Sequence, residues 1–303
     1  MSELTLKGLD GANPLGFLAA IGTLRIATVV WPSKRVKMKW VQESGGWRPR
    51  VFADVHELNE NLFIEKLNEN LKKMCGHPAF SFAKDLSIGC DEFRLRLVES
   101  FNTATFENHL FSDFLSAFGS EVVVDKNGII GDTAFRTMSG AGHQHFIGFM
   151  QELAEMTNES HLRSALFETW GYQDDKPSMR WDPCDDRRYA LRWGEPSKDP
   201  IKTVRGANRL AVEALPLFTT VPVGIRLETT GFTQKKGQRM NWSWPIWDAP
   251  ASLDVVRSLL SLKELQEESP DSDNLLTMGI CEVFRCQRIS QGKYRNFTPA
   301  VPV

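Results

Sequence analysis

A group of carboxylates in the second half of the chain is the first feature that could do chemistry. Asp182, Asp185 and Asp186 stand close together and are followed directly by Arg187. Clustered carboxylates can hold Mg²⁺ for phosphodiester hydrolysis, but a metal-dependent nuclease normally also carries a Lys or His base, and the segment 181–193 has neither. We therefore favour aspartates that pair with nearby arginines. A magnesium-dependent nuclease or phosphoesterase that uses the three aspartates remains the alternative.

Basic residues interleaved with aromatic rings form a second candidate site. In the stretch 180–209 basic residues outnumber acidic ones, and Trp181, Tyr189 and Trp193 lie among them. Arginine forks suit phosphate groups, and flat aromatic rings stack on unpaired bases. The same chemistry recurs before Trp242. The side chains that we expect to contact nucleic acid are Arg187, Arg188, Arg192, Lys202, Arg205, Asn208, Arg209, Lys235, Lys236, Arg239 and Trp242.

A third basic window lies near the end of the sequence. Arg285, Arg288, Lys293 and Arg295 occur there, and no acidic residue occurs between positions 284 and 303. The chain as a whole is not basic, because 36 Lys and Arg residues stand against 38 Asp and Glu residues, which gives a net charge of −2. Any contact with nucleic acid must therefore come from local patches of charge rather than from the overall charge.

Motifs for covalent catalysis are missing from the sequence. The loop Ser139–His145 is rich in small residues and looks like a phosphate cradle, but it lacks both the Lys-Ser/Thr pair of a P-loop and a complete G-x-G-x-x-G pattern. We expect a tight turn before a helix there. No G-x-S-x-G motif occurs anywhere in the chain. We therefore expect a protein that is not an enzyme, with no catalytic residues, no cofactor and no metal.

A long apolar helix is predicted near the start of the sequence, where it could position the later segments. Asn13 is a favourable N-cap, and Pro14 suits the first helical position because its missing N–H costs nothing there. The helix is expected to run to Val30, and it is apolar nearly all round, which is typical of a central buried helix. Gly16 and Ala20 belong to a stripe of small residues, which predicts that another backbone packs closely against this face.

The remaining patterns predict an α+β fold with mixed helices and antiparallel strands, with the helices concentrated in the first half. Residues 1–165 form a helix-rich α+β part, and residues 166–303 form a basic and aromatic part with more strands; the two parts are either separate or one continuous domain. A hairpin is expected at the end, from Ile280–Ile289 and Tyr294–Val301. The alternation of strands and helices is too irregular for a doubly wound parallel sheet.

The cysteines and the hydrophobic pattern indicate the compartment. The chain has 5 cysteines, an odd number with no C-x-x-C spacing, so neither a disulfide framework nor a structural zinc site is expected. The apolar stretch 14–31 contains Arg25, which is unfavourable in a transmembrane helix. The start of the chain also lacks the basic region of a signal peptide. We expect a cytoplasmic protein with no membrane contact.

Four segments carry a resemblance to a known family. They are residues 9–25 (LDGANPLGFLAAIGTLR), 139–146 (SGAGHQHF), 182–193 (DPCDDRRYALRW) and 205–216 (RGANRLAVEALP). In this order they resemble proteins encoded in CRISPR–Cas loci of type I-G, formerly called I-U. The similarity covers residues 9–216 as separate patches, and the last two segments are the most distinctive. None of the four is a catalytic signature.

The resemblance implies a subunit of a Cascade-type effector complex, similar to a large subunit that helps to hold guide RNA or target DNA in antiviral defence. The implied partners are guide RNA, target DNA and the other effector subunits. The resemblance implies no catalytic residues, and nothing in the chain is similar to the HD nuclease or helicase motifs of the degrading partner. A third hypothesis is a protein-binding scaffold that uses the tryptophan-rich region 242–247 as its anchor.

Overall fold

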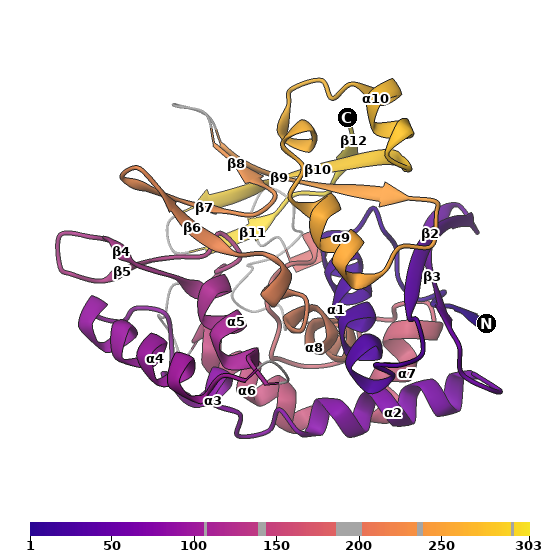
Figure 1. The fold of residues 1–303 in the computed structure, drawn as a ribbon, viewed down its shortest axis with the longest axis horizontal. Helices are drawn as coiled ribbons and strands as arrows, with labels where there is room; N and C mark the ends of the chain where they lie inside the picture. The colour runs from indigo at the N-terminus through magenta and orange to yellow at the C-terminus, as the bar shows by residue number, and fades with distance from the viewer. Residues whose placement is uncertain (106–107, 139–143, 186–201, 235–238, 292–293) are drawn as a thin grey trace.

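Residues 1–105, 108–138, 144–185, 202–234, 239–291 and 294–303 are described by the computed structural model (Figure 1). They form α-helices and antiparallel sheets, so the predicted α+β class is confirmed. The helices are not concentrated in the first half as we expected. One physical reason is that the C-terminal sheet also needs helices to cover it. Five helices follow residue 145, namely α6 (Phe146–Met156), α7 (Glu159–Phe167), α8 (Arg205–Val212), α9 (Leu253–Leu260) and α10 (Ser272–Thr277).

The central helix α1 (Pro14–Val30) begins and ends where the sequence predicts. Asn13 caps it, because the Asn13 Oδ1 accepts the backbone N–H of Gly16 at 3.1 Å. Residues 14–24 are all buried. A Cβ at Gly22 would lie 1.8 Å from the carbonyl oxygen of Leu210 in α8, so only glycine lets the two helices approach this closely. A Cβ at Gly16 would lie 2.4 Å from a carbonyl oxygen of the preceding loop, at Asp10.

An N-terminal sheet lies against this helix. It has the strand order β1-β3-β2 and is antiparallel throughout, with β1 (Ser2–Thr5), β2 (Lys37–Glu43) and β3 (Gly46–Ala53). Met38 and Trp40 of β2 are fully buried. Trp40 stacks on Phe17 of α1, with the ring centroids 5.7 Å apart. The alternating pattern of this hairpin therefore points its apolar side chains towards the central helix.

Further helices form the lower half of the molecule in Figure 1. Among them, α2 packs on α1 and α7, and α6 and α7 both pack on α8. Each buries an apolar face; α2, for example, buries Phe63, Ile64 and Leu67. This layer consists of α6 and α7 together with α2 (Glu60–Lys72), α3 (Pro78–Ser81), α4 (Cys90–Thr103) and α5 (Leu110–Phe118).

A larger antiparallel sheet closes the other side. Its main path is β11-β10-β9-β8, and β12 also pairs with β10. The predicted terminal hairpin is confirmed, because β10 pairs with β11 from Arg288 opposite Phe297 to Gln291 opposite Tyr294. The strands are β8 (Phe232–Thr233), β9 (Met240–Trp247), β10 (Ile280–Gln291), β11 (Tyr294–Phe297) and β12 (Val301–Pro302).

Two short hairpins project beside this sheet (Figure 1). One pairs β4 (Gly119–Val124) with β5 (Ile130–Asp132), and the other pairs β6 (Thr220–Val223) with β7 (Arg226–Thr229). They contact each other, because β4 packs against both β6 and β7. Short 3-10 turns complete the described elements: η1 (Pro183–Asp185), η3 (Leu215–Leu217) and η4 (Lys263–Gln266).

The hydrophobic core runs through both parts of the chain. Phe17, from the first part, lies 5.5 Å from the ring of Trp244, and Phe135 lies 5.0 Å from the ring of Trp242. One cluster of buried residues contains all four of these side chains. No helix among the described residues is both long enough and apolar enough to span a bilayer.

Candidate functional site

The structure places the predicted nucleic-acid contacts in three different environments. Five of the residues fall in segments outside the described residues, so their predicted contacts stay predictions: Arg187, Arg188, Arg192, Lys235 and Lys236. Three others lie in the interior. The last three, Lys202, Arg205 and Arg239, lie at the surface or near it.

Asn208, Arg209 and Trp242 are fully buried, which corrects the prediction that they contact nucleic acid at the surface. The Asn208 side chain accepts the backbone N–H of Met179 at 2.8 Å and donates to Thr203 at 3.0 Å. Trp242 packs between aromatic rings of the core. All three side chains belong to the faces of α8 and β9 that are buried in the core, and the composition of a window does not reveal this.

Arg209 forms a buried ion-pair network instead of a phosphate contact. Its Nη1 donates to Glu213 Oε1 at 2.7 Å, and Arg25 Nη1 donates to Glu213 Oε2 at 2.6 Å. Burial by itself would raise the pKa of Glu213, but Arg209 and Arg25 lower that pKa below its usual value. The carboxylate therefore stays charged between two guanidinium groups. The network joins α8 to α1.

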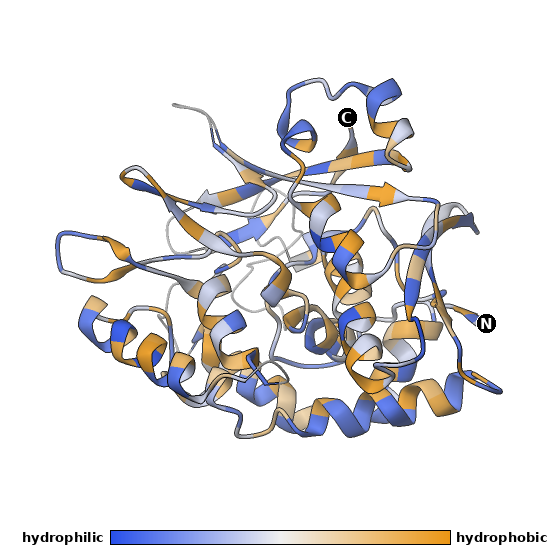
Figure 2. Cartoon of the chain, in the orientation of Figure 1, coloured by the Kyte–Doolittle hydropathy of each residue, from blue (hydrophilic) through white to orange (hydrophobic). Residues whose placement is uncertain are grey.

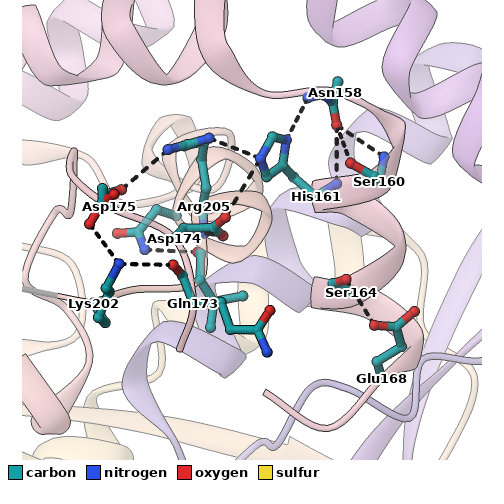
Figure 3. A network of polar contacts seen from close by, with 12 residues as sticks. Asn158, Ser160, His161, Ser164, Glu168, Gln173, Asp174, Asp175, Lys202 and Arg205 are labelled. Carbon is teal, nitrogen blue, oxygen red and sulfur yellow. Dashed lines mark hydrogen bonds and ion pairs between the residues drawn. The ribbon is translucent and has the colours of Figure 1, made fainter. Parts of the chain in front are cut away.

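Arg205 and Lys202 belong to one polar network at the surface, in which Asp175 pairs with Lys202 (Figure 3). Lys202 Nζ is 2.8 Å from Asp175 Oδ1, and the backbone N–H of Arg205 donates to Asp174 Oδ2 at 2.8 Å. Arg205 Nη1 lies 2.9 Å from Nε2 of His161 in α7. Burial lowers the pKa of His161. The charge of Asp174 raises this pKa, whereas the charge of Arg205 lowers it. This network holds the segment before α8 to α7.

Arg239, just before β9, is exposed. Its Nη1 donates to the Gln287 side chain at 3.3 Å. It makes no ion pair with any residue in the described part of the chain. Of the predicted contacts that the structure describes, Arg239 is the one most available to an anion.

The aspartates are not brought together as a metal site within the described residues. Asp182 is buried and accepts hydrogen bonds from the Tyr172 hydroxyl at 3.1 Å, from Asn13 Nδ2 at 3.3 Å and from the Cys184 backbone N–H at 3.0 Å. Burial, followed by the neighbouring Asp182 charge, raises the pKa of Tyr172. Asp185 lies in η1, and Asp186 falls outside the described residues.

Asp182 therefore has a structural contact with the first turn of α1, through the residue that caps that helix. Across the part of the chain that the structure describes, no group of three or more His, Cys, Asp or Glu side chains is placed to hold a metal ion.

A pocket of about 420 Å³ gathers basic residues that the sequence does not place next to one another. Residues of the C-terminal sheet, the β6–β7 hairpin and η4 line it. The cations that line it are Arg226 of β7, Lys263 of η4, Arg288 of β10 and Arg295 of β11. Four different elements thus supply one positive charge each.

Carboxylates do not balance these charges. Among the described residues two carboxylates line the pocket, Asp132 and Glu228, and Asp132 is already paired with Arg136. Arg226, Lys263 and Arg295 make no hydrogen bond or ion pair through their side chains with any described residue. A pocket with unpaired cations attracts anions, because their mutual repulsion is relieved when a negative charge enters.

Arg288 is the most buried of the four cations. Its Nη2 donates to the carbonyl oxygen of Arg136 at 2.6 Å, while its Nε has no hydrogen-bond partner among the described residues. The pKa of Arg288 is lowered to about 10, mainly by burial and then by the charge of Arg295; the charge of Arg136 also lowers it, whereas that of Asp132 raises it. The guanidinium stays charged at neutral pH, in an environment that favours an added anion.

Arg136, whose carbonyl oxygen accepts the hydrogen bond from Arg288, is itself fixed by several contacts. Arg136 is buried and binds Asp85 at 2.8 Å, Ser87 at 2.8 Å and Asp132. Asp85 also accepts the first backbone N–H of α6, that of Phe146, at 3.3 Å. The carbonyl that receives Arg288 therefore belongs to a residue fixed by two carboxylates, and the pocket floor is preorganised.

Apolar, hydroxyl and amide side chains make up most of the rest of the pocket. Leu227, Phe232 and Met240 line it, together with Gln266 of η4 and three threonines. The Gln266 amide has a buried oxygen and a buried nitrogen, and neither has a hydrogen-bond partner among the described residues. Unmade hydrogen bonds of this kind are uncommon in folded proteins, so this amide needs a partner such as an ordered water or a ligand.

The sequence pattern identifies two of the four cations that line this pocket. Arg288 and Arg295 lie in the third basic window, where the run without acidic residues is the signal, whereas Arg226 and Lys263 stand alone in the sequence. Arg285 of the same window does not line the pocket. Its guanidinium donates to the carbonyl oxygens of Leu265, at 3.0 Å, and of Glu267.

Comparisons with protein-family models, with curated protein sequences and with solved structures find no match for this chain.

Proposed function

We propose that this protein is a non-catalytic, cytoplasmic subunit of a CRISPR–Cas type I effector complex, which contacts guide RNA or target DNA in antiviral defence. The observation that supports nucleic-acid binding is the pocket whose four cations outnumber its carboxylates. The assignment to an effector complex depends on the resemblance of residues 9–216 to type I-G proteins. Both parts of the proposal can be tested separately.

The physical basis is a division of labour between the protein and the guide. The pocket arginines neutralise phosphates and supply affinity that does not depend on sequence, while base pairing with the guide supplies specificity. Each phosphate contact releases condensed counterions, so affinity falls as salt rises. No catalytic group is required for this role.

The test is the binding of labelled single-stranded RNA and DNA, measured by fluorescence anisotropy over a range of salt concentrations. Replacing Arg288 and Arg295 by Gln should weaken binding for every sequence tried. The slope of log affinity against log salt should decrease by about 1.4, which is about 0.7 for each lost contact with a single strand. The matched control is Lys202→Gln with Arg205→Gln, which removes the same charge from a compensated network.

Two outcomes would count against this proposal. If the control double variant loses binding and the pocket double variant does not, the interface lies at 202–209. If wild-type protein cleaves the strands in Mg²⁺, and Asp185→Asn abolishes the cleavage seen on a gel, the magnesium-dependent nuclease replaces the non-catalytic role.

A second candidate function is the binding of a partner protein. The tryptophan anchor expected at 242–247 is corrected, because Trp242, Trp244 and Trp247 are buried in the core. Exposed apolar side chains occur elsewhere, on the neighbouring elements α4, β4 and the β6–β7 hairpin, where Figure 2 colours apolar residues orange. This apolar face includes Phe101, 79% exposed, and Ile225, 90% exposed, with Leu95, Val98, Val122, Val124, Val221 and Val223. Exposed apolar side chains that gather on neighbouring elements are typical of interaction sites.

The occupant that we propose for this face is another subunit of the same effector complex. Leu95→Glu with Phe101→Glu should prevent co-elution with the purified subunits of the locus, while binding of single strands is retained. Leu276→Glu is the control, because Leu276 is 57% exposed on α10, away from this face. Co-elution that survives the double variant would remove the face from the interface.

A further inference from the structure

We propose that the cationic pocket accepts one whole nucleotide, with its phosphate held by arginines and its base held by neighbouring apolar and amide side chains. This inference rests on the proposed function and deepens it, because a groove that only follows the backbone needs no room for a base. The pocket volume of about 420 Å³ falls in the range of small-ligand sites. Both basic and apolar side chains line this one pocket.

The phosphate wall consists of Arg288 and Arg295. In the β10–β11 hairpin Arg295 stands opposite Ser290, two residues from Arg288, so the two arginines are diagonal neighbours on one face of the ribbon. Each guanidinium offers several N–H donors, and the Nε of Arg288 is still without a partner among the described residues. Two forks on one face suit the oxygens of a single phosphate group.

The base wall consists of Phe232, Met240 and Gln266. Phe232 is itself supported from behind by Trp242, whose ring stacks on it at 5.7 Å with an interplanar angle of 11°. The Gln266 amide presents one acceptor and two donors, and none of them is used by a described residue. An amide of this kind can form paired hydrogen bonds with a base edge, as glutamine does with adenine. The pocket therefore suits a nucleoside monophosphate unit better than a bare phosphate.

Isothermal titration calorimetry of the whole chain tests this inference. The probes are the four nucleoside 5′-monophosphates, the corresponding nucleosides and inorganic phosphate. At least one monophosphate should bind about tenfold tighter, or more, than both its nucleoside and inorganic phosphate. Equal affinity for the monophosphates and for inorganic phosphate, or no binding of any probe, would overturn the inference.

Substitutions test which residues bind the phosphate and which bind the base. Arg288→Gln should weaken monophosphates and inorganic phosphate alike, by about tenfold, while Gln266→Leu should weaken the monophosphates and leave inorganic phosphate unchanged. If Arg288→Gln fails to fold, Lys263→Gln provides the same test. Lys263 is exposed at the rim, so we expect a smaller loss of affinity for the monophosphates and inorganic phosphate. A Gln266→Leu protein that binds every monophosphate as the wild type does would contradict the base wall.

The same proteins separate this inference from the proposed function. Single-strand binding that depends on Arg288 and Arg295, without any preference for monophosphates over phosphate, removes only the nucleotide pocket. Tight monophosphate binding without binding of any strand removes the role in holding guide RNA or target DNA and identifies a site for free nucleotides. A competition experiment, in which monophosphate displaces the labelled strand from the wild type, supports a nucleotide unit within a strand.

Discussion

Two groups of basic residues in this protein differ in what surrounds them. Around α8, Arg209 lies in the interior beside Glu213, and Lys202 pairs with Asp175 at the surface. In the pocket, by contrast, Arg295 and Lys263 have no acidic partner among the described residues. The first group stabilises the contact between elements, whereas the second leaves its charge available.

The comparison shows that the density of arginines in a window is a poor guide to binding. The stretch 180–209 is rich in basic residues, yet two of its described members, Lys202 and Arg209, are paired with carboxylates. The pocket draws its cations from four separate elements. Availability depends on whether carboxylates lie within a few ångströms in space, because opposite charges at that range cancel each other's field.

The largest expected effect concerns the buried network. Glu213→Gln leaves Arg209 and Arg25 facing each other without a carboxylate, so the free energy of unfolding should fall by about 3–5 kcal/mol. Urea denaturation measures this loss. The matched control is Glu228→Gln, an exposed glutamate at the pocket, which should change stability by less than about 0.5 kcal/mol. Similar values for the two variants would mean that the α8 arginines are not compensated in the way described.

A second effect concerns the helix contact that brings the network together. Gly22→Ala places a Cβ 1.8 Å from the Leu210 carbonyl oxygen, so α1 and α8 must separate. We expect a loss of about 1–3 kcal/mol or more in the free energy of unfolding. Gly89→Ala is the control, because nothing lies within 4 Å of a Cβ at that position. A melting temperature for Gly22→Ala equal to that of the control would contradict the close packing.

A substitution in the pocket should change the free energy of unfolding in the opposite direction. Arg288→Gln removes a buried cation that burial and the neighbouring arginines disfavour, so stability should stay unchanged or rise by up to about 1 kcal/mol. The same substitution weakens nucleic-acid binding. Thermal unfolding and anisotropy on one preparation measure both effects. A protein that loses stability and binding together would place Arg288 with the structural arginines of α8.

The smallest effect is a dependence on pH at the surface network. The folded pKa of His161 is lowered below its ordinary value of 6.5, so the folded state favours the neutral ring. The stability that this contributes is fully present above pH 6.5 and is lost as pH falls through the lowered folded pKa. His161→Gln removes this titration and keeps an acceptor at the capping-box position.

Urea unfolding at pH values of about 7.5 and 5.5 should show a larger decrease in stability for the wild type than for His161→Gln, by up to about 1 kcal/mol. Equal decreases would mean that the folded state does not lower the pKa of His161, which would contradict its partly buried place in the network of Figure 3.

Local signals account for the elements that could be predicted. Asn13 and Pro14 define the start of α1 because capping involves atoms only a few residues apart. The β10–β11 hairpin follows from two runs separated by a short turn. The distribution of helices was not predictable in the same way, since most of the stability of a helix comes from packing against other elements.

Tertiary structure alone decided which charges are free. Arg25 and Glu213 are far apart in the sequence, and their ion pair exists because Gly22 lets α1 approach α8. The sequence by itself determined where the basic windows lie, including the one that holds Arg288. Whether a window binds an anion depends on distances in space, and these arise only when helices and strands pack together. Electrostatic interaction falls with separation in space, not with separation along the chain.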